Sequence, residues 1–311
     1  MDYIIKLYRY LAVISIWVGS TPFIESKPYI AICAIFRDED LFLREWIEHH
    51  RALQVDHFYL YNNLSSDTYL QILQPYIEEG IVDLVDWPVE TDNQQEYLHK
   101  LQIPAYLHAL HRAQEDLVDW AAFIDLDEFL NPHTYDTLPE LLAEYQEYPG
   151  LAINWQLFGT SWVAKLNSGE ALIEHLVLKG DPNLPLNQMV KLIVQPARVK
   201  GINNPHSFEF FNGELAVNSR KEPFPATASS QAVLCDIVQL NHYWFGPENW
   251  FFTHKLARRE KWRMKISPLQ VQSLIAEYNQ VRDESIIRFL NKNKKEYSSE
   301  NTAFSSASVP S

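Results

Sequence analysis

Residues 120–129 read WAAFIDLDEF, an apolar run that leads directly into two aspartates. The run predicts a buried strand over 120–124, because short apolar stretches bounded by polar residues are typical of such strands. The chain turns where a strand ends, so the carboxylates of Asp125 and Asp127 can reach one cation. Mg²⁺ and Mn²⁺ prefer such oxygen ligands, and either ion could neutralise a diphosphate leaving group. The alternative is that both aspartates cap a following helix, in which Glu128 would lie at the helix start.

Strands and helices alternate on the N-terminal side of this motif. The apolar patterns predict strands over 29–36, 57–61 and 81–87, and helices over 41–53, 66–79 and 94–114. This alternation predicts βαβ units and an α/β fold with a mostly parallel, Rossmann-like sheet flanked by helices. Ligands of such sheets bind at the carboxyl ends of the strands. We therefore expect one crevice to collect the polar residues that follow the strands, which are Arg37, Asp38, Glu39, Asn62, Asn63, Asp125 and Asp127.

The C-terminal half has a less regular pattern. It predicts strands over 151–158, 190–194 and 233–240, with helices over 247–264 and 268–291. The Ser-rich stretch 296–311 is predicted to be a disordered tail. A single catalytic domain over 28–295 follows from these assignments.

The N-terminus resembles a targeting segment. Lys6 and Arg9 precede the apolar residues 11–18, and small residues follow. This run is far shorter than the ~20 residues of a bilayer-spanning helix. Segment 1–27 is therefore either a signal or membrane-associating segment, which would make the protein exported or membrane-associated, or an ordinary amphipathic helix of a cytoplasmic protein.

Composition excludes several classes of protein. The formal net charge is −14, which disfavours nucleic acid as a partner. The chain has no GxGxxG or GxxxxGK[ST] motif, so dinucleotide-fingerprint and P-loop chemistry are unsupported. Cys33 and Cys235 lie in apolar runs, and two cysteines cannot make a disulfide framework, so buried free thiols are expected.

A second group of candidate residues lies at 239–259. His242 follows an apolar run, and its imidazole could complete a metal shell. Lys255, Arg258 and Arg259 share a helix face that could hold a diphosphate. The alternatives are a structural histidine and a solvated basic surface.

Three further features are weaker. His206 ends the turn-rich stretch 191–206, where it is either close to an acceptor or metal or an ordinary loop histidine. The stretch WQLFGTS at 155–161 breaks at a glycine that allows close approach of a ligand. His49 and His50 lack metal-binding spacing and are interpreted as surface or core residues of a helix.

Taken in order, AIFRDED, YNNLSSD, FIDLDEF, NWQLFGTS, KLIVQPARV, NPH and NHYW resemble glycosyltransferase family 92 over 30–260. The resemblance implies a GT-A fold and an inverting transfer from a nucleotide-sugar donor, often UDP-galactose, to a glycan, glycolipid or glycoprotein. It implies Mn²⁺ or Mg²⁺ on Asp125 and Asp127, with His242 as a third ligand. It also implies a nucleotide pocket that includes Phe36, Arg37, Glu39, Asn62 and Asn63.

This chain departs from the family pattern at two places. Trp162 stands where relatives tend to have Gly, which alters the expected acceptor shape. Phe245-Gly246 stands where relatives often have Lys-Ser, which leaves the phosphate contacts to Lys255, Arg258 and Arg259.

An inverting transfer needs a general base for the acceptor hydroxyl. Glu174, Asp181 and His206 are the candidates. Two other functions stay open at this point. One is a non-catalytic carbohydrate-binding protein with the same fold, and the other is a metal-dependent phosphohydrolase, whose motif would normally follow the first strand.

Overall fold

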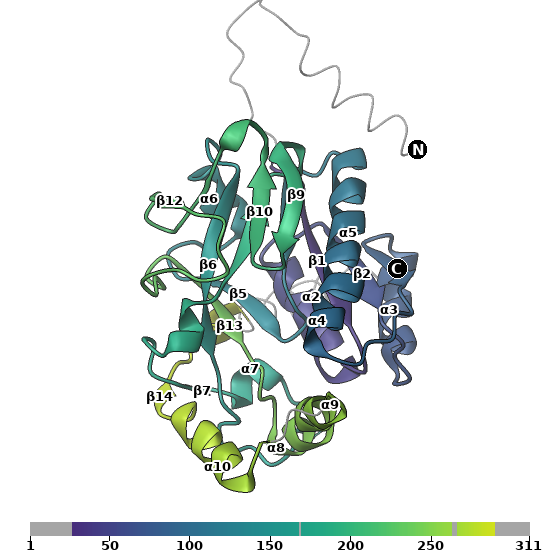
Figure 1. The fold of residues 1–311 in the computed structure, drawn as a ribbon, viewed down its shortest axis with the longest axis vertical. Coiled ribbons are helices and arrows are strands. Elements are labelled where there is room, and N and C mark those ends of the chain that lie inside the picture. The colour runs from purple at the N-terminus through teal and green to yellow at the C-terminus, as the bar shows by residue number, and fades with distance from the viewer. Residues whose placement is uncertain (1–26, 168, 263–265, 290–311) are drawn as a thin grey trace, which may run out of the picture.

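A mixed ten-stranded sheet forms the centre of the protein. The computed structural model describes residues 27–167, 169–262 and 266–289. Along the main path the strand order is β12-β11-β6-β8-β4-β1-β2-β3, with β13 pairing with β6 and β5 (Figure 1). The strands are β1 (Ile30–Phe36), β2 (His57–Asn62), β3 (Val82–Asp86), β4 (Trp120–Phe123), β5 (Glu128–Pro132), β6 (Gly150–Leu157), β8 (Val190–Val194), β11 (Ala216–Val217), β12 (Pro223–Phe224) and β13 (Val238–His242).

The sheet is parallel where the sequence alternates most regularly. Strands β4, β1, β2 and β3 run parallel to one another, whereas β8 is antiparallel to both β4 and β6. Strand β13 is parallel to β6 and antiparallel to β5. The predicted α/β fold with a mostly parallel sheet is therefore confirmed, with β8 reversed inside the sheet and β5 and β12 reversed at its edges.

Helices cover both faces of the sheet. Ile30 and Ile32 of β1 pack in the cluster that contains Trp46 of α2, while Ala31 and Cys33 pack with Ala109 of α5 on the opposite face. Successive strand residues point to opposite faces, so one apolar run serves both layers. The main helices are α2 (Asp40–Ala52), α3 (Tyr69–Glu78), α5 (Ile103–Glu115), α6 (Leu138–Ala143) and α10 (Pro268–Glu277), and the shorter ones are α4 (Gln94–Glu96), α7 (Leu172–His175), α8 (Glu248–Trp250) and α9 (Ala257–Lys261).

Two of the predicted long helices each contain a π-helical stretch. Residues Tyr97–Gln102 (η1) join α4 to α5, and Phe251–Leu256 (η5) join α8 to α9. Such stretches reorient side chains within a helix and are frequent at functional sites. Short 3-10 turns lie at Pro185–Gln188, Pro196–Arg198 and Phe211–Gly213, and two small pairs of strands complete the fold, β9 (Val199–Asn204) with β10 (Ser207–Phe210) and β7 (Leu178–Lys179) with β14 (Val281–Arg282).

Three predicted boundaries in the C-terminal half and one in the N-terminal half were wrong. Helix 268–291 ends at Glu277, because the Asn279 side chain is held by the backbone N–H of Ser161 and the hydroxyl of Thr160. Strand 233–240 starts only at Val238, since the Leu234 N–H donates to the Asn154 side chain instead of to a neighbouring strand. Helix 247–264 ends at Lys261, with Trp262 as its C-cap, and helix 66–79 begins later, at Tyr69.

The predicted targeting segment over 1–27 and the predicted tail over 296–311 lie outside the described residues, apart from Lys27. Among the helices that the structure describes, none has both the length and the apolar character of a bilayer span. Both cysteines are free, as predicted; Cys33 is buried, whereas Cys235 is only half-buried.

Candidate active site

The motif FIDLDEF forms a tight turn between two buried strands. The Asp125 carbonyl accepts the N–H of Glu128 at 3.0 Å, and the Asp125 N–H donates to the Glu128 carboxyl at 2.9 Å. Ile124 and Leu126 are buried and anchor the turn. Strand β5 follows the turn, so the interpretation of both aspartates as caps of a following helix was wrong. Glu128 holds the turn from β5 instead.

Asp127 is the centre of a buried charge cluster. Its Oδ2 accepts from Lys255 Nζ at 2.5 Å, and its Oδ1 lies 3.4 Å from His242 Nε2. Burial alone would raise the pKa of Asp127, but Lys255 and His242 outweigh burial and hold this pKa well below its usual value. Lys255 also lies 3.8 Å from Glu39, whose pKa burial raises to about 7. Asp127 is therefore a carboxylate at neutral pH with one oxygen directed at His242.

Asp125 is engaged by a different lysine. Its Oδ2 accepts from Lys191 Nζ at 3.0 Å, and its Oδ1 accepts longer hydrogen bonds from Gln102 at 3.3 Å and Tyr106 at 3.5 Å. Burial opposes ionisation of Asp125, yet the ion pair with Lys191 lowers the pKa of this carboxyl overall. Lys191 was missed as a site residue. Its position as the lone charge in the apolar strand VKLIV is a signal that could have indicated a buried partner.

His242 reaches the aspartates because β13 pairs with β5. The register places His242 opposite Glu128, with His242 Nδ1 3.9 Å from Glu128 Oε1. Burial raises the pKa of Glu128 well above its usual value, which favours its neutral form. The ring of Trp155 packs edge-on against His242, with a centroid distance of 4.4 Å, and also contacts His206 at 5.5 Å. Trp155 thus contacts both histidines.

These residues include the donors that Mn²⁺ and Mg²⁺ take, namely two carboxylates and an imidazole. Asp127 Oδ1 and His242 Nε2 lie close enough for one ion to touch both. Asp125 is turned to Lys191 instead, and within the described residues no three acidic, His or Cys side chains are grouped tightly enough to hold a metal as they stand. The side-chain atoms of Asp125, Asp127 and His242 are of the types that bind a divalent ion. Of these three residues, Asp127 and His242 are also close enough together to share one ion.

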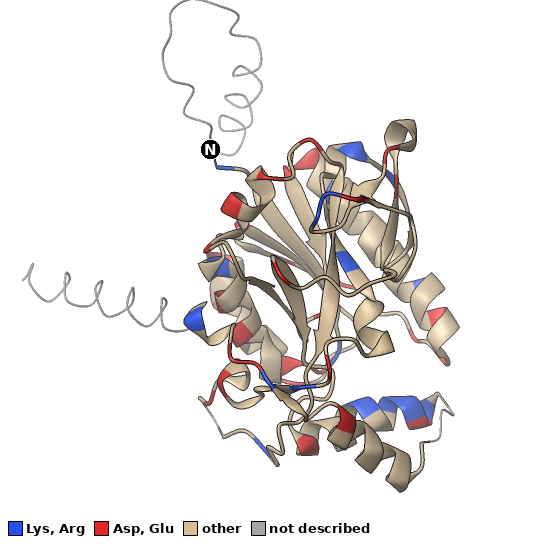
Figure 2. Ribbon diagram, turned by 90° about the vertical axis from the view of Figure 1, so that its left-hand side faces the viewer, with Lys and Arg blue, Asp and Glu red and all other residues tan. Residues whose placement is uncertain are grey.

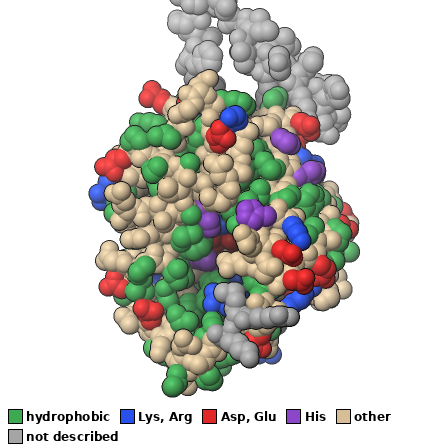
Figure 3. All heavy atoms as spheres, viewed as in Figure 1, with side chains coloured by type: hydrophobic (Ala, Val, Ile, Leu, Met, Phe, Trp, Pro, Cys, Tyr) green, Lys and Arg blue, Asp and Glu red, His purple; other side chains and the backbone are tan. Residues whose placement is uncertain are grey.

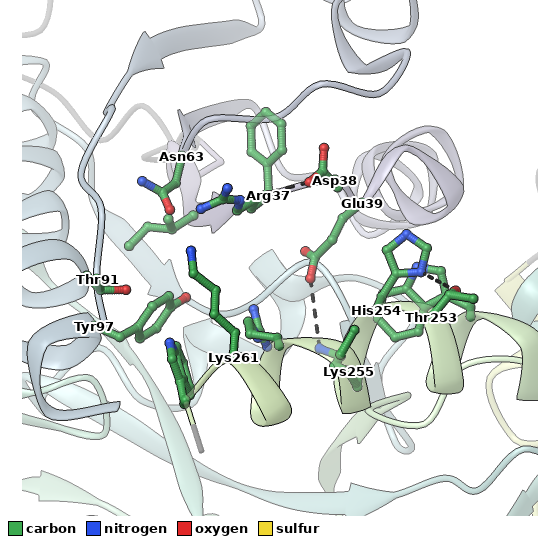
Figure 4. A pocket seen from close by; sticks show the side chains of 16 residues that line it. Arg37, Asp38, Glu39, Asn63, Thr91, Tyr97, Thr253, His254, Lys255 and Lys261 are labelled. Atoms are coloured by element: carbon green, nitrogen blue, oxygen red, sulfur yellow. Dashed lines mark hydrogen bonds and ion pairs between the residues drawn. The ribbon is translucent and has the colours of Figure 1, made fainter. Parts of the chain in front are cut away.

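The first of two cavities lined by Lys255 has a volume of about 300 Å³ and lies between the ends of β1 and β2 and the helix η5–α9. Figure 4 shows Arg37, Asn63, Tyr97 and Lys261 around it, with the Glu39 carboxyl directed at Lys255. Of the predicted nucleotide-pocket residues, the lining includes Phe36, Arg37, Glu39, Asn63, Lys255 and Arg258.

Asp125 and Asn62 were predicted to lie at this pocket as well, but neither lines the first cavity, and the Asn62 side chain has other partners. Its amide donates to Tyr69 and Asp86, and its carbonyl accepts the Ser65 N–H. Asn62 and Asn63 are neighbours at the end of β2, so their side chains point to opposite sides. Only Asn63 lines the first cavity.

The second cavity, of about 380 Å³, adjoins the first. Its lining comprises Gln94, Tyr97, Leu98, Gln102, Asn204, Pro205, His206, Ala228, Trp244, Lys255, Arg258, Arg259 and Trp262. Tyr97, Lys255, Arg258 and Trp262 line both cavities and form the partition between them. The face of the molecule seen in Figure 3 has a hollow at its centre, and histidine and acidic side chains lie in this hollow. Both π-helical stretches contribute side chains to the two cavities.

The three candidate bases lie in different places. His206 lines the second cavity, whereas Glu174 lies on α7 and Asp181 is exposed in the loop after β7, so neither of these lines either cavity. His206 Nδ1 lies 2.7 Å from the Val190 carbonyl and donates its proton there, which leaves Nε2 as the acceptor nitrogen. Burial, with help from the nearby Lys191, lowers the pKa of His206 to about 4, so its ring is neutral at pH 7.

The two departures from the family pattern lie outside both cavities. Trp162 is 59% exposed and has a φ of 62°, in the left-handed region that favours glycine. Phe245 is buried against Phe251 and Tyr278, and a side chain added at Gly246 would come within 2.7 Å of Trp250. Residues Phe245 and Gly246 therefore contribute no phosphate contact to either of the two described cavities. The cations that line these cavities lie at other positions of the chain.

His49 and His50 are core residues. The His49 ring bonds the Leu130 carbonyl at 2.7 Å, and the Leu130 N–H donates to His50 at 3.3 Å. They fix α2 to β5 and take no part in either cavity.

A carboxylate pair follows the central strand β4, and Lys255, which binds Asp127, lines two cavities near the carboxyl ends of the parallel strands, although Asp125, Asp127 and His242 are not in the lining of either. This arrangement is that of a GT-A type of glycosyltransferase. The model of glycosyltransferase family 92 matches residues 28–282, and the chain belongs to this family. A family 92 protein of Ricinus communis is 25% identical over 242 residues, which cover 75% of this chain and 38% of that protein. One of Oryza sativa subsp. japonica is 31% identical over 121 residues, or 39% of this chain and 19% of that protein.

The chain thus spans less than half the length of these curated relatives. Among solved structures, S. aureus TarS 1-349 is 13% identical, with 80% of this chain and 70% of that chain covered and a TM-score of 0.38.

Proposed function

We propose that this protein transfers a sugar from a nucleotide-diphosphate donor, for which UDP-galactose is the first to test, to the hydroxyl group of a glycan, glycolipid or glycoprotein. The nucleotide would occupy the first cavity and the acceptor the second. The observation that carries the proposal is the partition between the two cavities, where Lys255 is bonded to Asp127. Cations on this partition would face the diphosphate at the point where donor and acceptor meet.

Asp125, Asp127 and His242 would hold Mn²⁺ or Mg²⁺, which when bound supplies positive charge for the diphosphate leaving group. The chain contributes further positive charge of its own. Arg37, Arg258 and Lys261 line the first cavity, and each can donate to phosphate oxygens. Tyr97 offers an aromatic ring on the partition.

His206 is the general base that the geometry favours over Glu174 and Asp181. Its Nε2 would take the proton of the acceptor hydroxyl as that oxygen bonds to the anomeric carbon. The bond from that carbon to the diphosphate oxygen breaks, and nucleoside diphosphate leaves. Inversion of the anomeric centre follows if the acceptor attacks from the side opposite the diphosphate. The acceptor-side location of His206 supports this outcome.

The test is to incubate the full chain with a panel of nucleotide sugars and Mn²⁺ and to measure release of nucleoside diphosphate. Slow hydrolysis of one donor, accelerated by a glycan acceptor with formation of a glycoside, is expected. Phosphate release from simple phosphomonoesters, without use of any nucleotide sugar, would instead identify a phosphohydrolase. Glycan binding without turnover of any donor would identify a non-catalytic carbohydrate-binding protein.

A further inference from the structure

The lining of the second cavity has an unusual charge composition. It contains the cations Lys255, Arg258 and Arg259 and no Asp or Glu, although the chain as a whole has 40 acidic and 26 basic residues. The first cavity, in contrast, contains Asp38 and Glu39 among its cations. A concentration of one sign of charge in a hollow of an oppositely charged protein attracts ligands of the other sign.

Arg258 and Arg259 both lack an ion pair in the described part of the chain, but Arg258 also lines the first cavity, whereas Arg259 lines only the second. Lys255 is neutralised by Asp127, but Arg259 forms no ion pair within the described part of the chain. Its guanidinium lies 4.7 Å from the ring centroid of Trp244, which holds it in place. Burial, and then repulsion from Arg258, lower the pKa of Arg259. A half-buried guanidinium without a counter-ion is well placed to receive one from a ligand.

Arg259 is also separated from the donor side. It lines only the second cavity, whereas Lys261 lines only the first and Arg258 lies on the partition. Figure 2 shows the Lys and Arg positions of α9 as a run of blue along one helix at the edge of the molecule. Successive positions of this helix thus serve different cavities, and Arg259 is directed to the acceptor.

We propose that the second cavity selects an acceptor sugar carrying an anionic group, a carboxylate or a phosphate, and that Arg259 binds this group. The inference rests on the proposed function, because it takes the second cavity as the acceptor site. The planar guanidinium would donate two hydrogen bonds to the anion. Trp244 and Trp262 would provide apolar faces for the sugar ring, and the neutral side chains Gln94, Gln102 and Asn204 would bind hydroxyl groups.

The experiment measures binding and needs no turnover. Titrations of the full chain compare methyl glucuronide, glucose 6-phosphate and the neutral methyl glucoside, in the presence of UDP and Mn²⁺. The wild-type protein should bind at least one of the two anionic sugars about tenfold more tightly than the neutral one. Tighter binding of methyl glucuronide would indicate that the cavity prefers a carboxylate, and tighter binding of glucose 6-phosphate would indicate a preference for a phosphate. Arg259→Gln should abolish the preference, while Arg220→Gln, which removes an exposed arginine, should preserve it.

UDP affinity separates this inference from the proposed function. Arg259→Gln should leave UDP affinity within about twofold of wild type, because Arg259 does not line the first cavity. If the substitution weakens the binding of UDP as much as the binding of the anionic sugar, Arg259 contacts the donor. The inference is then wrong, whereas the proposed donor site is not contradicted. Equal binding of all three sugars by the wild type would also overturn it. Failure of UDP and of every other nucleoside diphosphate from the donor panel to bind the wild type would instead contradict the proposed function.

Discussion

The two cavities share one helix and differ in charge. The first contains acidic and basic side chains together, so its cations are already partly neutralised before any ligand binds. The lining of the second contains cations but no Asp or Glu. The segment 255–261 supplies both, because residues on a helix point in different directions along its length. One basic helix segment can therefore line two cavities that differ in charge.

A substitution where the two cavities meet should reduce activity most. Asp127→Asn removes the carboxylate that Lys255 and His242 share, and we expect donor hydrolysis to fall about 10³-fold. It also leaves the Lys255 ammonium buried without its partner, at a cost of about 3 kcal/mol in the free energy of unfolding. Steady-state release of nucleoside diphosphate and urea unfolding measure the two effects.

Two further variants separate these effects. Asp127→Asn combined with Lys255→Met should recover most of the stability but none of the activity. Asp136→Asn changes an exposed aspartate and should change neither quantity. Activity of the single variant within tenfold of wild type would mean that the place where the cavities meet is not the reaction centre.

The core beneath the cavities should be sensitive to acid. Burial lowers the pKa of His49 to about 4 in the folded protein, against about 6.5 in the unfolded chain. The unfolded state therefore binds more protons between these values, and the contribution of His49 to stability is full above pH 6.5 and is lost as pH falls to 4. The loss is about 3 kcal/mol at pH 4.

The measurement is the difference in unfolding free energy between wild type and His49→Gln from pH 7 to pH 4. Glutamine can still donate to the Leu130 carbonyl but does not titrate, so its curve should fall less steeply. His111→Gln, at an exposed position, should follow the wild type. Parallel curves for wild type and His49→Gln would show that His49 accepts a proton in the folded state as easily as in the unfolded one.

A substitution of His206 tests whether the second cavity holds the general base. His206→Gln should lower kcat about 10²-fold while UDP affinity stays unchanged, because the residue lines only the second cavity. With a pKa of about 4, the base is unprotonated throughout the neutral range. The wild-type kcat/KM should therefore be constant from pH 5 to pH 7 and fall only below that. An inflection near pH 6.5 that disappears in His206→Gln would contradict this environment for His206.

The N-terminal half of this site could be predicted from the sequence, and the C-terminal half only in part. Strands β1 to β4 are local apolar runs with polar ends, so the strands themselves and the position of Arg37 and Glu39 at one cavity could be predicted from chain periodicity. The contact between Lys191 and Asp125 depends instead on the reversed strand β8 pairing with β4, which no local pattern encodes. Tertiary packing also determines the π-helical stretches and the contacts of Trp155 with His206 and His242, so the sequence did not predict them.

The smallest expected effect concerns Trp162, where the family pattern has glycine. A non-glycine residue at φ 62° costs roughly 1 kcal/mol, so Trp162→Gly should stabilise the protein by about that amount. Trp162→Ala is the matched control, because it removes the same exposed ring but keeps the Cβ atom that causes the strain. Thermal or urea unfolding should therefore rank Gly above Ala, with UDP affinity equal in both, since Trp162 does not line the first cavity. If alanine stabilises as much as glycine, the exposed ring and not the backbone is the unfavourable feature, and the departure from the family pattern carries no conformational cost.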